Sequence, residues 1–420
     1  MSFERLKCQR SRSMSRVLLI TPYYAPDLGP SATLYSMLSE ELVRLGHHVT
    51  VLAAVPHYPT GNVPTEYRRK LVHRENRNGV NVIRVWVPSM NRSDLLKRLA
   101  VFVCYQIMAT LTGLRETYDV VIATNPALEV GIPLLALGVA RGEPIIYSVQ
   151  DIYPDVGVKL GVFRNPIIVR CLDVAERVCL RSAGAVHVIS EGFKEILEAR
   201  GVRGAVIRVI PNWTDIECIH PMSRLNAFSG EYGLDPFFVV MYAGNIGLSQ
   251  GLEQILDVAT RLAHLPTIRF AFVGDGAGRE GLQEAASRAG MENVVFIPFQ
   301  PRERVAEVLA SADVSLVSLR AGLSTDSVPS KCYSILASGR PVIAMVDKYS
   351  DTWRLIHQAQ CGTCVEPGAV EDLVDAVMRL YQDREHADKL GKNGRRYVQE
   401  NHSKTGAARQ FAQLIEEVVA

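Results

Sequence analysis

The chain has 420 residues, of which 48% are hydrophobic and 21% are charged. This composition is typical of a globular protein with a sizeable core, and the length favours two domains over one. The formal net charge of +2 comes from nearly equal numbers of acidic and basic residues, which excludes the strongly basic balance of many nucleic-acid-binding proteins.

Short apolar strands alternate with longer helical patterns from Arg16 onward, which is typical of parallel α/β units. In the first unit, a strand is followed by a loop rich in Pro and Gly and by a helix that ends at Gly46. Further strands are predicted in the stretches 48–54, 80–88, 119–124 and 144–151, and the stretch 184–191 closes this half.

A second series of α/β units begins near Pro236. Its strands are predicted in 237–243, 268–276, 294–299, 314–319, 340–345 and 362–368, and everything after Gly368 is helical. The sequence therefore predicts an α/β protein with two Rossmann-like domains, which we place at 15–205 and 206–400. The remaining helix, 401–420, carries an apolar stripe and is expected to pack back on the N-terminal domain. Because parallel sheets bind ligands beyond the carboxyl ends of their strands, loops of both domains should line a cleft.

Some features leave open a contact with a membrane surface. Basic residues cluster in the stretches 5–16 and 68–77, and 95–114 is predicted to form an amphipathic helix with a basic N-terminal end. A solvated surface is the alternative for the clusters, and core packing is the alternative for the helix. We find no run of ~18 apolar residues and no convincing signal peptide, and the scattered cysteines are typical of a cytosolic protein.

Three stretches of the second half contain groups that bind phosphate. In 243–251, Gly244, Gly247 and Gly251 lie between a strand and a helix, so backbone N–H groups and a helix N-terminus are available to an anion. The spacing is neither that of the dinucleotide-binding fingerprint nor that of a P-loop. A glycine-rich connector that serves only tight packing is the alternative.

Lys331 lies in the second of these stretches, 328–344, where a short helix is predicted to start at Ser330. A lysine in the first helical turn opposes the helix dipole, at a cost of up to ~1 kcal/mol, unless an anion is bound there. We therefore expect Lys331 to bind phosphate. The third stretch holds Asp275 at a strand end, where it can accept hydrogen bonds from a ribose or a base, or cap the following turn.

Polar side chains interrupt the end of the predicted strand 144–151. Gln150 and Asp151 follow an apolar run, and Asp155 comes four residues later, directly after Pro154. Polar groups at the end of a buried strand cost free energy unless they are paired or used, so we consider these three as candidate site residues. Capping of the turn at Pro154 is the alternative for the two acids.

These stretches give the chain a resemblance to a known family. It resembles family 4 of the retaining glycosyltransferases over nearly all of its length. Within that family it looks most like the branch that builds bacterial surface polysaccharides, including colanic-acid and O-antigen fucosamine-type transferases. The likeness is carried by "LLITPYYAPDLGPSA", "QDIYPDVGV", "PNWTD", "YAGNIGLSQGLEQIL", "FVGDGAGREGL" and "VPSKCYSILASGRPVIA". The resemblance implies the GT-B fold, in which two Rossmann-like domains face each other across a cleft.

The resemblance and the arguments above together imply a donor-binding set of Gly29, Gly244, Asn245, Gly247, Gln250, Asp275, Asp326, Ser330 and Lys331. Several charged positions of the family differ in this chain. Asn245 and Gln250 stand where the family has an arginine and a lysine, and the second acid of its acidic pair is Ser334. These departures shift the electrostatic work onto Lys331, with Arg320 as a second candidate.

Gln150 stands where the family commonly has a histidine that reaches the donor sugar. An amide can hydrogen-bond a sugar hydroxyl, but it cannot carry a proton at neutral pH. The catalytic candidates are therefore Lys331, Gln150 and Asp151, and the acceptor-binding candidates are Asp155 and His57. For His57, packing within its own loop is the alternative.

The resemblance implies retaining transfer of a hexose-type or N-acetylhexosaminyl sugar from a nucleoside diphosphate donor to a polyprenyl-linked or saccharide acceptor. UDP is preferred over GDP because the fucosamine-type relatives use it. No metal or other cofactor and no nucleic-acid partner are implied, and the enzyme is expected in the cytoplasm, peripheral on the inner face of the cell membrane. The alternatives are a nucleotide-sugar epimerase of the same architecture and a non-catalytic GT-B subunit.

Overall fold

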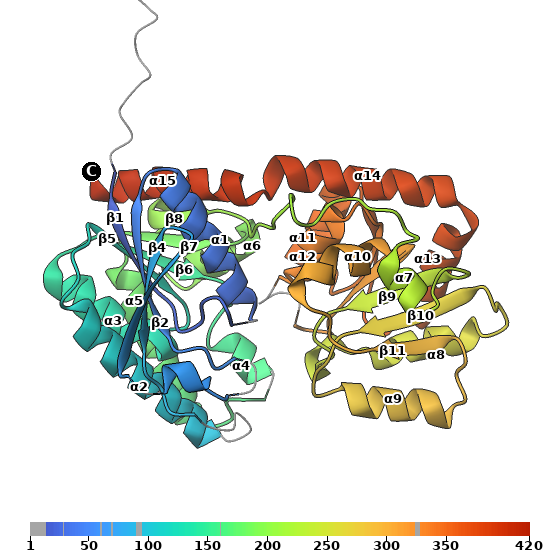
Figure 1. Ribbon diagram of the computed structural model, residues 1–420, viewed down its shortest axis with the longest axis horizontal. Helices are drawn as coiled ribbons and strands as arrows, with labels where there is room; N and C mark the ends of the chain where they lie inside the picture. The colour runs from blue at the N-terminus through green and yellow to red at the C-terminus, as the bar shows by residue number, and fades with distance from the viewer. Residues whose placement is uncertain are drawn as a thin grey trace, which may run out of the picture.

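The computed structural model consists of two α/β domains that lie side by side (Figure 1). It describes residues 14–27, 29–58, 61–68, 70–89, 95–159, 161–323 and 328–420. Each domain is built on one sheet, and its central strands are buried on both faces, as in β5 (Val120–Thr124), where every residue is buried. Such continuous apolar runs are typical of parallel sheets covered by helices. The predicted α/β class is confirmed.

The N-terminal sheet has the strand order β3-β4-β2-β1-β5-β6-β7-β8, and β3 is antiparallel to its neighbour while the other pairs are parallel. Alternate residues of β1 contact opposite layers, because Leu18 and Ile20 belong to one hydrophobic cluster and Val17 and Leu19 to another. The strands besides β5 are β1 (Arg16–Ile20), β2 (His48–Ala54), β3 (Val72–Arg77), β4 (Val80–Val85), β6 (Ile145–Val149), β7 (Ala185–Val188) and β8 (Ile207–Val209).

Strand β8 extends the N-terminal sheet beyond the predicted domain boundary at 205. It pairs with β7, with Ile207 opposite Val186 and Val209 opposite Val188, so it belongs to the N-terminal sheet. The stretch 184–191 therefore does not close this half. β8 has only three residues, and the middle one, Arg208, is exposed, so its apolar run is too short to be recognised as a strand.

Strand β3 lies in the stretch 68–77, where the sequence indicates a cluster of basic residues and predicts no strand. It forms a hairpin with β4 through Asn78 and Gly79, whose φ angles are 52° and 89°. Two successive positive φ angles at Asn-Gly are the signature of the tight hairpin turn whose twist matches that of the strands. This dipeptide was the available signal for the missing strand.

Helices cover both faces of the N-terminal sheet. Helices α2, α3 and α5 pack beside one another on one face, and α1 packs on the other face with the C-terminal helix α15. No helix in the described part of the chain is long and apolar enough to cross a membrane. The helices of this domain are α1 (Pro30–Arg44), α2 (Leu95–Gly113), α3 (Ala127–Leu137), α4 (Asp155–Lys159), α5 (Pro166–Ser182) and α6 (Glu191–Ala199).

The C-terminal sheet is parallel throughout, with the order β11-β10-β9-β12-β13-β14. Its strands are β9 (Phe238–Ala243), β10 (Ile268–Val273), β11 (Val294–Ile297), β12 (Val314–Ser318), β13 (Val342–Met345) and β14 (Gly362–Val365). Its helices are α7 (Ala227–Glu231), α8 (Glu253–Arg261), α9 (Arg279–Arg288), α10 (Val305–Ala310), α11 (Lys331–Ala337), α12 (Asp351–Ala359) and α13 (Val370–Gln382).

The last two helices link the domains. Figure 1 shows α14 (Arg384–Asn401) along the second domain and α15 (Lys404–Val419) along the first. Between them, the Thr214 amide donates to the carbonyl of His402 at 2.9 Å, and the Lys404 ammonium lies 2.8 Å from a carboxylate oxygen of Asp215. The chain thus crosses between the domains twice at one place. Phe411 of α15 is fully buried in the layer beneath α1.

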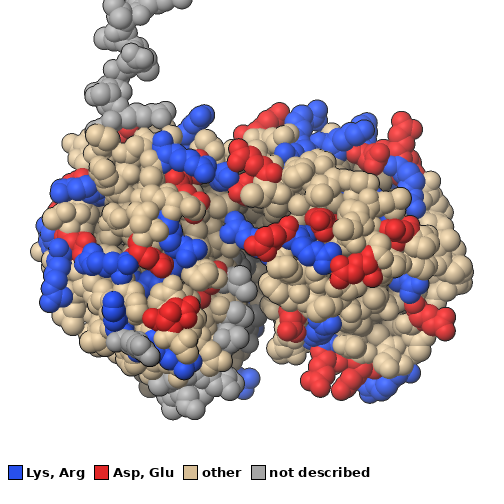
Figure 2. Space-filling model, in the orientation of Figure 1, with Lys and Arg blue, Asp and Glu red and all other residues tan. Residues whose placement is uncertain are grey.

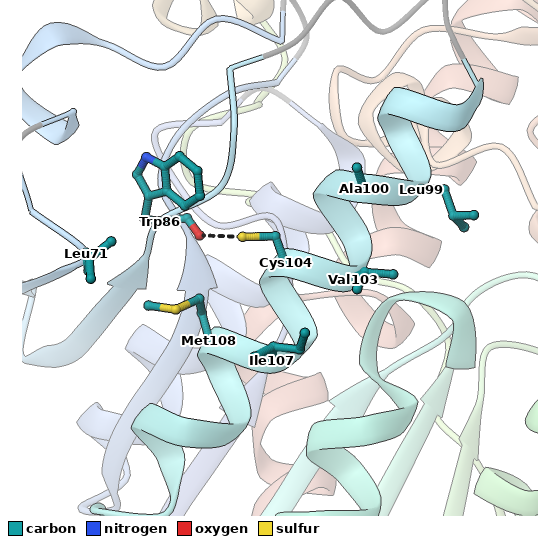
Figure 3. Close-up of a pocket in the computed structure, with 8 residues that line it drawn as sticks. All are labelled: Leu71, Trp86, Leu99, Ala100, Val103, Cys104, Ile107 and Met108. Carbon is teal, nitrogen blue, oxygen red and sulfur yellow. Dashed lines mark hydrogen bonds between the residues drawn. The ribbon is translucent and has the colours of Figure 1, made fainter.

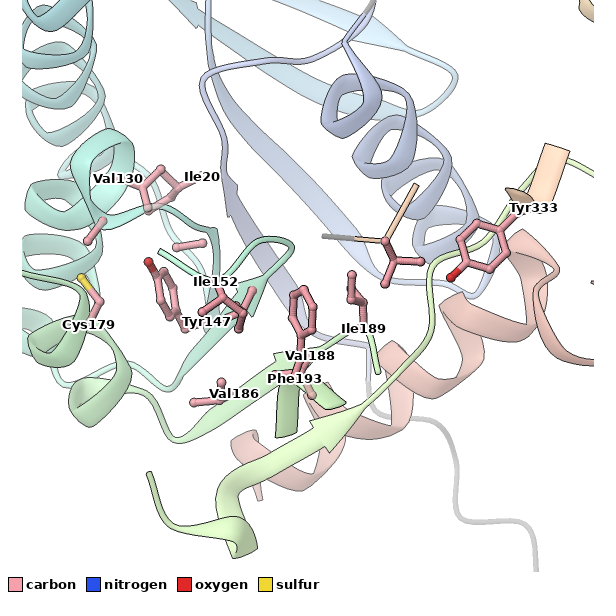
Figure 4. Packing of buried hydrophobic residues seen from close by; sticks show 14 of the residues in the cluster. Ile20, Val130, Tyr147, Ile152, Cys179, Val186, Val188, Ile189, Phe193 and Tyr333 are labelled. Carbon is pink, nitrogen blue, oxygen red and sulfur yellow. The ribbon is translucent and has the colours of Figure 1, made fainter. Parts of the chain in front are cut away.

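The domains also share a continuous apolar contact. Ile189 and Phe193 of the first domain and Tyr333 of the second belong to one buried cluster, and Figure 4 shows them in a single line of side chains. Beside this contact, the Ser190 hydroxyl donates to the Asp351 carboxylate at 2.6 Å. Away from these contacts the two halves are separated by a furrow, which Figure 2 shows on one face of the molecule.

Candidate active site

The loops that follow the strands of both sheets meet at this furrow. Figure 1 shows α4 on the side of the first domain that faces the second, and α11 and α12 on the opposing side of the second domain. Helix α4 follows β6, α11 follows β12 and α12 follows β13. The furrow is therefore lined by the carboxyl ends of parallel strands, which is where such sheets bind ligands.

Two loops of the C-terminal domain, 244–251 after β9 and 274–278 after β10, pack directly on each other; we call them the glycine cradle. The Ile246 amide donates to the carbonyl of Asp275 at 2.8 Å, and the Gly278 amide donates to the carbonyl of Ile246 at 2.8 Å. These cross-links make the two loops a single rigid edge of the furrow.

Glycine is required at the contact between the two loops. Gly274 and Gly276 have φ angles of 136° and 151°, a region that side chains with a Cβ rarely adopt. A Cβ on Gly274 would overlap the carbonyl oxygen of Gly244, and a Cβ on Gly276 would lie 2.5 Å from that of Ile246. Tight packing between the loops therefore explains Gly274 and Gly276. Gly244 differs, because it also lies beside the ammonium of Lys331.

Lys331, the first residue of α11, reaches the edge of the cradle. Its ammonium donates to the hydroxyl of Tyr242 and lies 3.8 Å from the centroid of that ring, and a Cβ on Gly244 would lie 3.3 Å from Nζ. The Tyr242 hydroxyl in turn donates to the carbonyl of Asn245 at 2.7 Å. The ammonium is thus held at the glycine loop by a tyrosine that sequence reasoning missed.

Burial lowers the pKa of Lys331 to about 7. Among the described residues no carboxylate pairs with this ammonium to offset the loss of hydration. A dehydrated cation without a counter-charge gains more from binding an anion than a solvated surface lysine does. The geometry therefore favours Lys331 as the group that meets a diphosphate.

The amides that replace the family's charged pair also lie in the cradle. A Cβ on Gly247 would lie 2.8 Å from Nδ2 of Asn245 and 2.6 Å from Oε1 of Gln250, and that Oε1 is buried with no partner in the described structure. Arg320 is committed elsewhere, since it pairs with Glu253 at 2.6 Å and donates to a cradle carbonyl. Arg320 therefore braces the loop, and Arg279 braces it too by donating to the carbonyls of Gly274 and Ile297. The ammonium of Lys331, in contrast, donates to a hydroxyl and, within the described structure, to no carbonyl of the cradle.

The other candidates for donor binding either are exposed or lie outside the described residues. The Asp275 side chain is exposed and accepts from the amide of Gly276 at 2.8 Å, which is the turn-capping role that the sequence left open. Ser330 precedes α11 and is exposed, and its hydroxyl does not cap the helix. Asp326 lies outside the described residues.

Across the furrow, Asn125 holds the segment that contains Gln150 and Asp151. Its side-chain Oδ1 accepts from the Gln150 amide at 2.8 Å, and its Nδ2 donates to the carbonyl of Asp151 at 2.6 Å. Nε2 of Gln150 is buried without a hydrogen-bond partner among the residues described. The Gln150 side chain also lies near the buried Tyr35 hydroxyl, where it partly offsets the effect of burial, which raises the pKa of Tyr35. One amide side chain after β5 thus fixes both residues after β6.

Asn125 is backed by a buried acid. The Glu176 carboxylate accepts from the amide of Ala127 at 2.9 Å and from the hydroxyl of Tyr147 at 2.8 Å. Burial raises the pKa of Glu176, and hydrogen bonds from these groups and from Asn125 partly offset the effect. The network anchors the end of β6 to α3 and α5.

Asp155 and Arg200 form an ion pair at 2.6 Å, and Arg200 also donates to the carbonyl of Tyr153 at 2.9 Å. This contact ties α4 to the end of α6. The carboxylate of Asp155 is thus engaged in a structural pair, and the hypothesis of an acceptor ligand gains no support from its position.

His57 lies in a buried loop beside the start of α1. Its amide donates to the Asp27 carboxylate at 2.9 Å, and its Nδ1 lies 2.9 Å from the carbonyl of Val55. Burial raises the pKa of Asp27. Gly29, at the N-cap of α1, is buried against the ring of Tyr58, which would lie 3.6 Å from an added Cβ. Packing of His57 within its loop, the alternative from the sequence, therefore describes much of its environment.

Two family models match the chain. The model described as "Glycosyl transferase 4-like domain" matches residues 29–213, and the model described as "Glycosyl transferases group 1" matches residues 229–397. These matches cover every strand of the two sheets except β1 and include both halves of the site. The chain belongs to the family 4 glycosyltransferases. The enzyme class and the family that the sequence motifs indicated are confirmed.

Individual relatives extend over the same length. This glycosyltransferase is 27% identical over 406 residues to WcaI of Escherichia coli, named for colanic acid biosynthesis, with 94% of this chain and 98% of that one covered. It is 28% identical over 345 residues to the probable glycosyltransferase WbjE of Pseudomonas aeruginosa, with 78% of this chain and 82% of that one covered.

Solved structures confirm the GT-B fold of the glycosyltransferase. Sucrose-phosphate synthase from Thermosynechococcus elongatus superposes with a TM-score of 0.77 at 20% identity, over 96% of this chain and 98% of that one. Anabaena HepE in complex with UDP superposes with a TM-score of 0.72 at 17% identity, over 96% of this chain and 100% of that one.

Tyr242 and Asn125 are the site residues that sequence reasoning missed. Each is a polar side chain at the end of an apolar run, Tyr242 within β9 and Asn125 directly after β5. That position was the signal which singled out Gln150. Their partners Lys331 and Gln150 are 89 and 25 residues away in sequence, so spacing alone did not connect them.

Proposed function

We propose that this glycosyltransferase moves a hexose-type sugar from a UDP-sugar, with retention of configuration, to a polyprenyl-linked saccharide during the synthesis of a surface polysaccharide. The observation that carries the proposal is the ammonium of Lys331 at the glycine cradle, without an acidic partner in the described structure. The choice of pathway is supported by the name of WcaI, and the choice of donor by the UDP that HepE binds.

The site residues support a charge-stabilised transfer. As the bond between the anomeric carbon and the donor phosphate oxygen breaks, negative charge develops on the leaving diphosphate. Lys331 and the cradle amides would meet that charge, which is why we propose that no metal ion is needed. The acceptor hydroxyl attacks the anomeric carbon and its proton passes to the leaving phosphate oxygen, while Gln150 orients a sugar hydroxyl through its unpaired Nε2.

We place the enzyme on the inner face of the cell membrane. Support comes from α2, whose outward residues Leu99, Val103, Ile107 and Leu111 are exposed although they are apolar. An apolar helix face that is turned to solvent is typical of helices that lie in a membrane interface. Binding to vesicles that contain an anionic lipid at low salt tests this part of the proposal, and a protein that ignores such vesicles would contradict it.

Calorimetric titration with UDP and with GDP tests the proposed donor. UDP should bind more tightly than GDP, and Lys331→Met should weaken the binding of UDP. Incubation of a UDP-sugar with lipid extracts should then label a lipid fraction, and a chelator such as EDTA should leave the rate unchanged. Tighter binding of GDP, or loss of transfer with EDTA, would refute the corresponding part.

A further inference from the structure

An apolar groove lies on the N-terminal domain between α2 and the hairpin of β3 and β4. It has a volume of about 660 Å³ and is open to solvent along its length, since Leu71, Val103 and Ile107 on its walls are exposed. Figure 3 shows one wall formed by successive turns of α2 and the other by Leu71 and Trp86. The lining residues are Leu71, Trp86, Leu99, Ala100, Val103, Cys104, Ile107 and Met108.

The chemistry of this groove suits a hydrocarbon chain. The thiol of Cys104 donates to the carbonyl of Trp86 at 3.5 Å, and the amide of Trp86 donates to the carbonyl of Leu71 at 2.9 Å, so these polar groups are already paired. A bound peptide would bring an N–H and a C=O at every residue, and the lining offers too few partners for them. A chain that carries no hydrogen-bonding groups has no such cost.

The rim of the groove adds positive charge. Arg68 and Lys70 are exposed on the segment that leads into β3, and Lys70 directly precedes Leu71. Arg74 of β3 is exposed as well. Of these, Arg74 also pairs with Glu116 at 2.5 Å. Apolar side chains beside basic ones match the two parts of a lipid phosphate, its hydrocarbon chain and its anionic head.

The groove also begins beside the loop that contains His57. The amide of Val55 donates to the carbonyl of Val85 at 2.9 Å, and Trp86 is the next residue of that strand, while His57 lies two residues after Val55. Both residues follow the carboxyl ends of β2 and β4, which are neighbours in the sheet. A chain in the groove would therefore have its polar end close to the site.

We propose that this groove binds the isoprenoid chain of the polyprenyl-linked acceptor, with the basic rim near its phosphate; this rests on the proposed function. The groove then selects the acceptor by its lipid, and it holds the chain next to the loops that bind the saccharide. Leu99, Val103 and Ile107 line the groove and are also exposed apolar residues of α2, so the groove opens on the helix face that we place against the bilayer.

Farnesyl phosphate, titrated below its aggregation concentration, tests the proposal through the fluorescence of Trp86. We expect a saturable blue shift that inorganic phosphate does not produce and that Trp86→Phe removes. Val103→Glu should weaken binding at least ~10-fold, because a carboxylate would enter an apolar site. Val178→Glu on α5 is the matched control, since Val103 and Val178 are 45% and 41% exposed, and it should bind as the unaltered protein does.

Three results would overturn the proposal. The first is equal weakening of farnesyl phosphate binding by both glutamate variants, and the second is a fluorescence shift produced by inorganic phosphate alone. The third is a dimer in sedimentation experiments that Val103→Glu dissociates, because this would assign the groove to a second copy of the chain. Calorimetry with UDP on the same variants keeps the two proposals apart. A protein that binds farnesyl phosphate in the groove but not UDP would refute the donor assignment alone.

Discussion

The affinity for UDP should depend on the protonation of Lys331. With a pKa of about 7, its protonated fraction falls from about one half at pH 7.0 to about 3% at pH 8.5. A phosphate charge ~4 Å from the ammonium, at an effective dielectric constant of ~20, is worth ~4 kcal/mol, or ~3 pH units. The pKa of the lysine should therefore rise to ~10 when UDP binds.

Because only the charged lysine attracts the diphosphate, UDP affinity should fall on the order of tenfold between pH 7.0 and 8.5. Calorimetry in buffers of different ionisation enthalpy should also detect proton uptake of up to one proton per UDP, largest near pH 8.5. Lys331→Arg, which stays charged, should bind UDP with little dependence on pH in this range. Lys331→Met should bind weakly at every pH.

The reasoning is refuted if the unaltered protein binds UDP equally well at both pH values. It is also refuted if Lys331→Met keeps the slope of the unaltered protein, because another group would then cause it.

Three further predictions concern the rest of the site. Asn125→Leu removes two hydrogen bonds, each worth ~1–3 kcal/mol when a buried partner is left unpaired. It should therefore lower kcat at least ~10-fold while the Kd for UDP stays unchanged. An unchanged kcat in a transfer assay would contradict the role of Asn125 in holding Gln150 and Asp151. Gly276→Ala places a Cβ 2.5 Å from the carbonyl oxygen of Ile246 and should abolish UDP binding in calorimetry. Gly281→Ala is the control, because its added Cβ would have no neighbouring atom within 4 Å, and it should bind UDP normally. Equal UDP binding by both variants would count against a rigid cradle. Gln150→His should keep transfer activity and Gln150→Ala should mainly raise KM, and loss of kcat with KM unchanged in Gln150→Ala would give this amide another role.

The fold was predictable where the signal is local. Strands such as β5 are buried on both faces and appear in the sequence as plain apolar runs. The strand β3 has polar residues on its exposed face, and β8 is three residues long, so neither gives such a run. Their places in the sheet are decided by pairing with β4 and β7, which is a tertiary effect.

The site was predictable only in part for the same reason. Lys331 and the glycines could be selected because a helix terminus and a positive φ angle constrain the local sequence. The partner of Lys331 is a hydroxyl 89 residues away, and Arg320, a second candidate from the sequence, is paired with Glu253 in the structure. Which polar residues are already engaged depends on contacts between loops, and spacing along the chain does not reveal those contacts.

Helix α15 determines when the first domain can complete its fold during synthesis. Its residues Phe411, Leu414 and Ile415 belong to the apolar layer between α1 and the N-terminal sheet, although they are among the last residues of the sequence printed here. During synthesis this layer stays uncovered until α15 has left the ribosome, after the second domain has emerged. Removal of α15 should therefore expose the core of the first domain and promote aggregation, even though every strand of both sheets is still present.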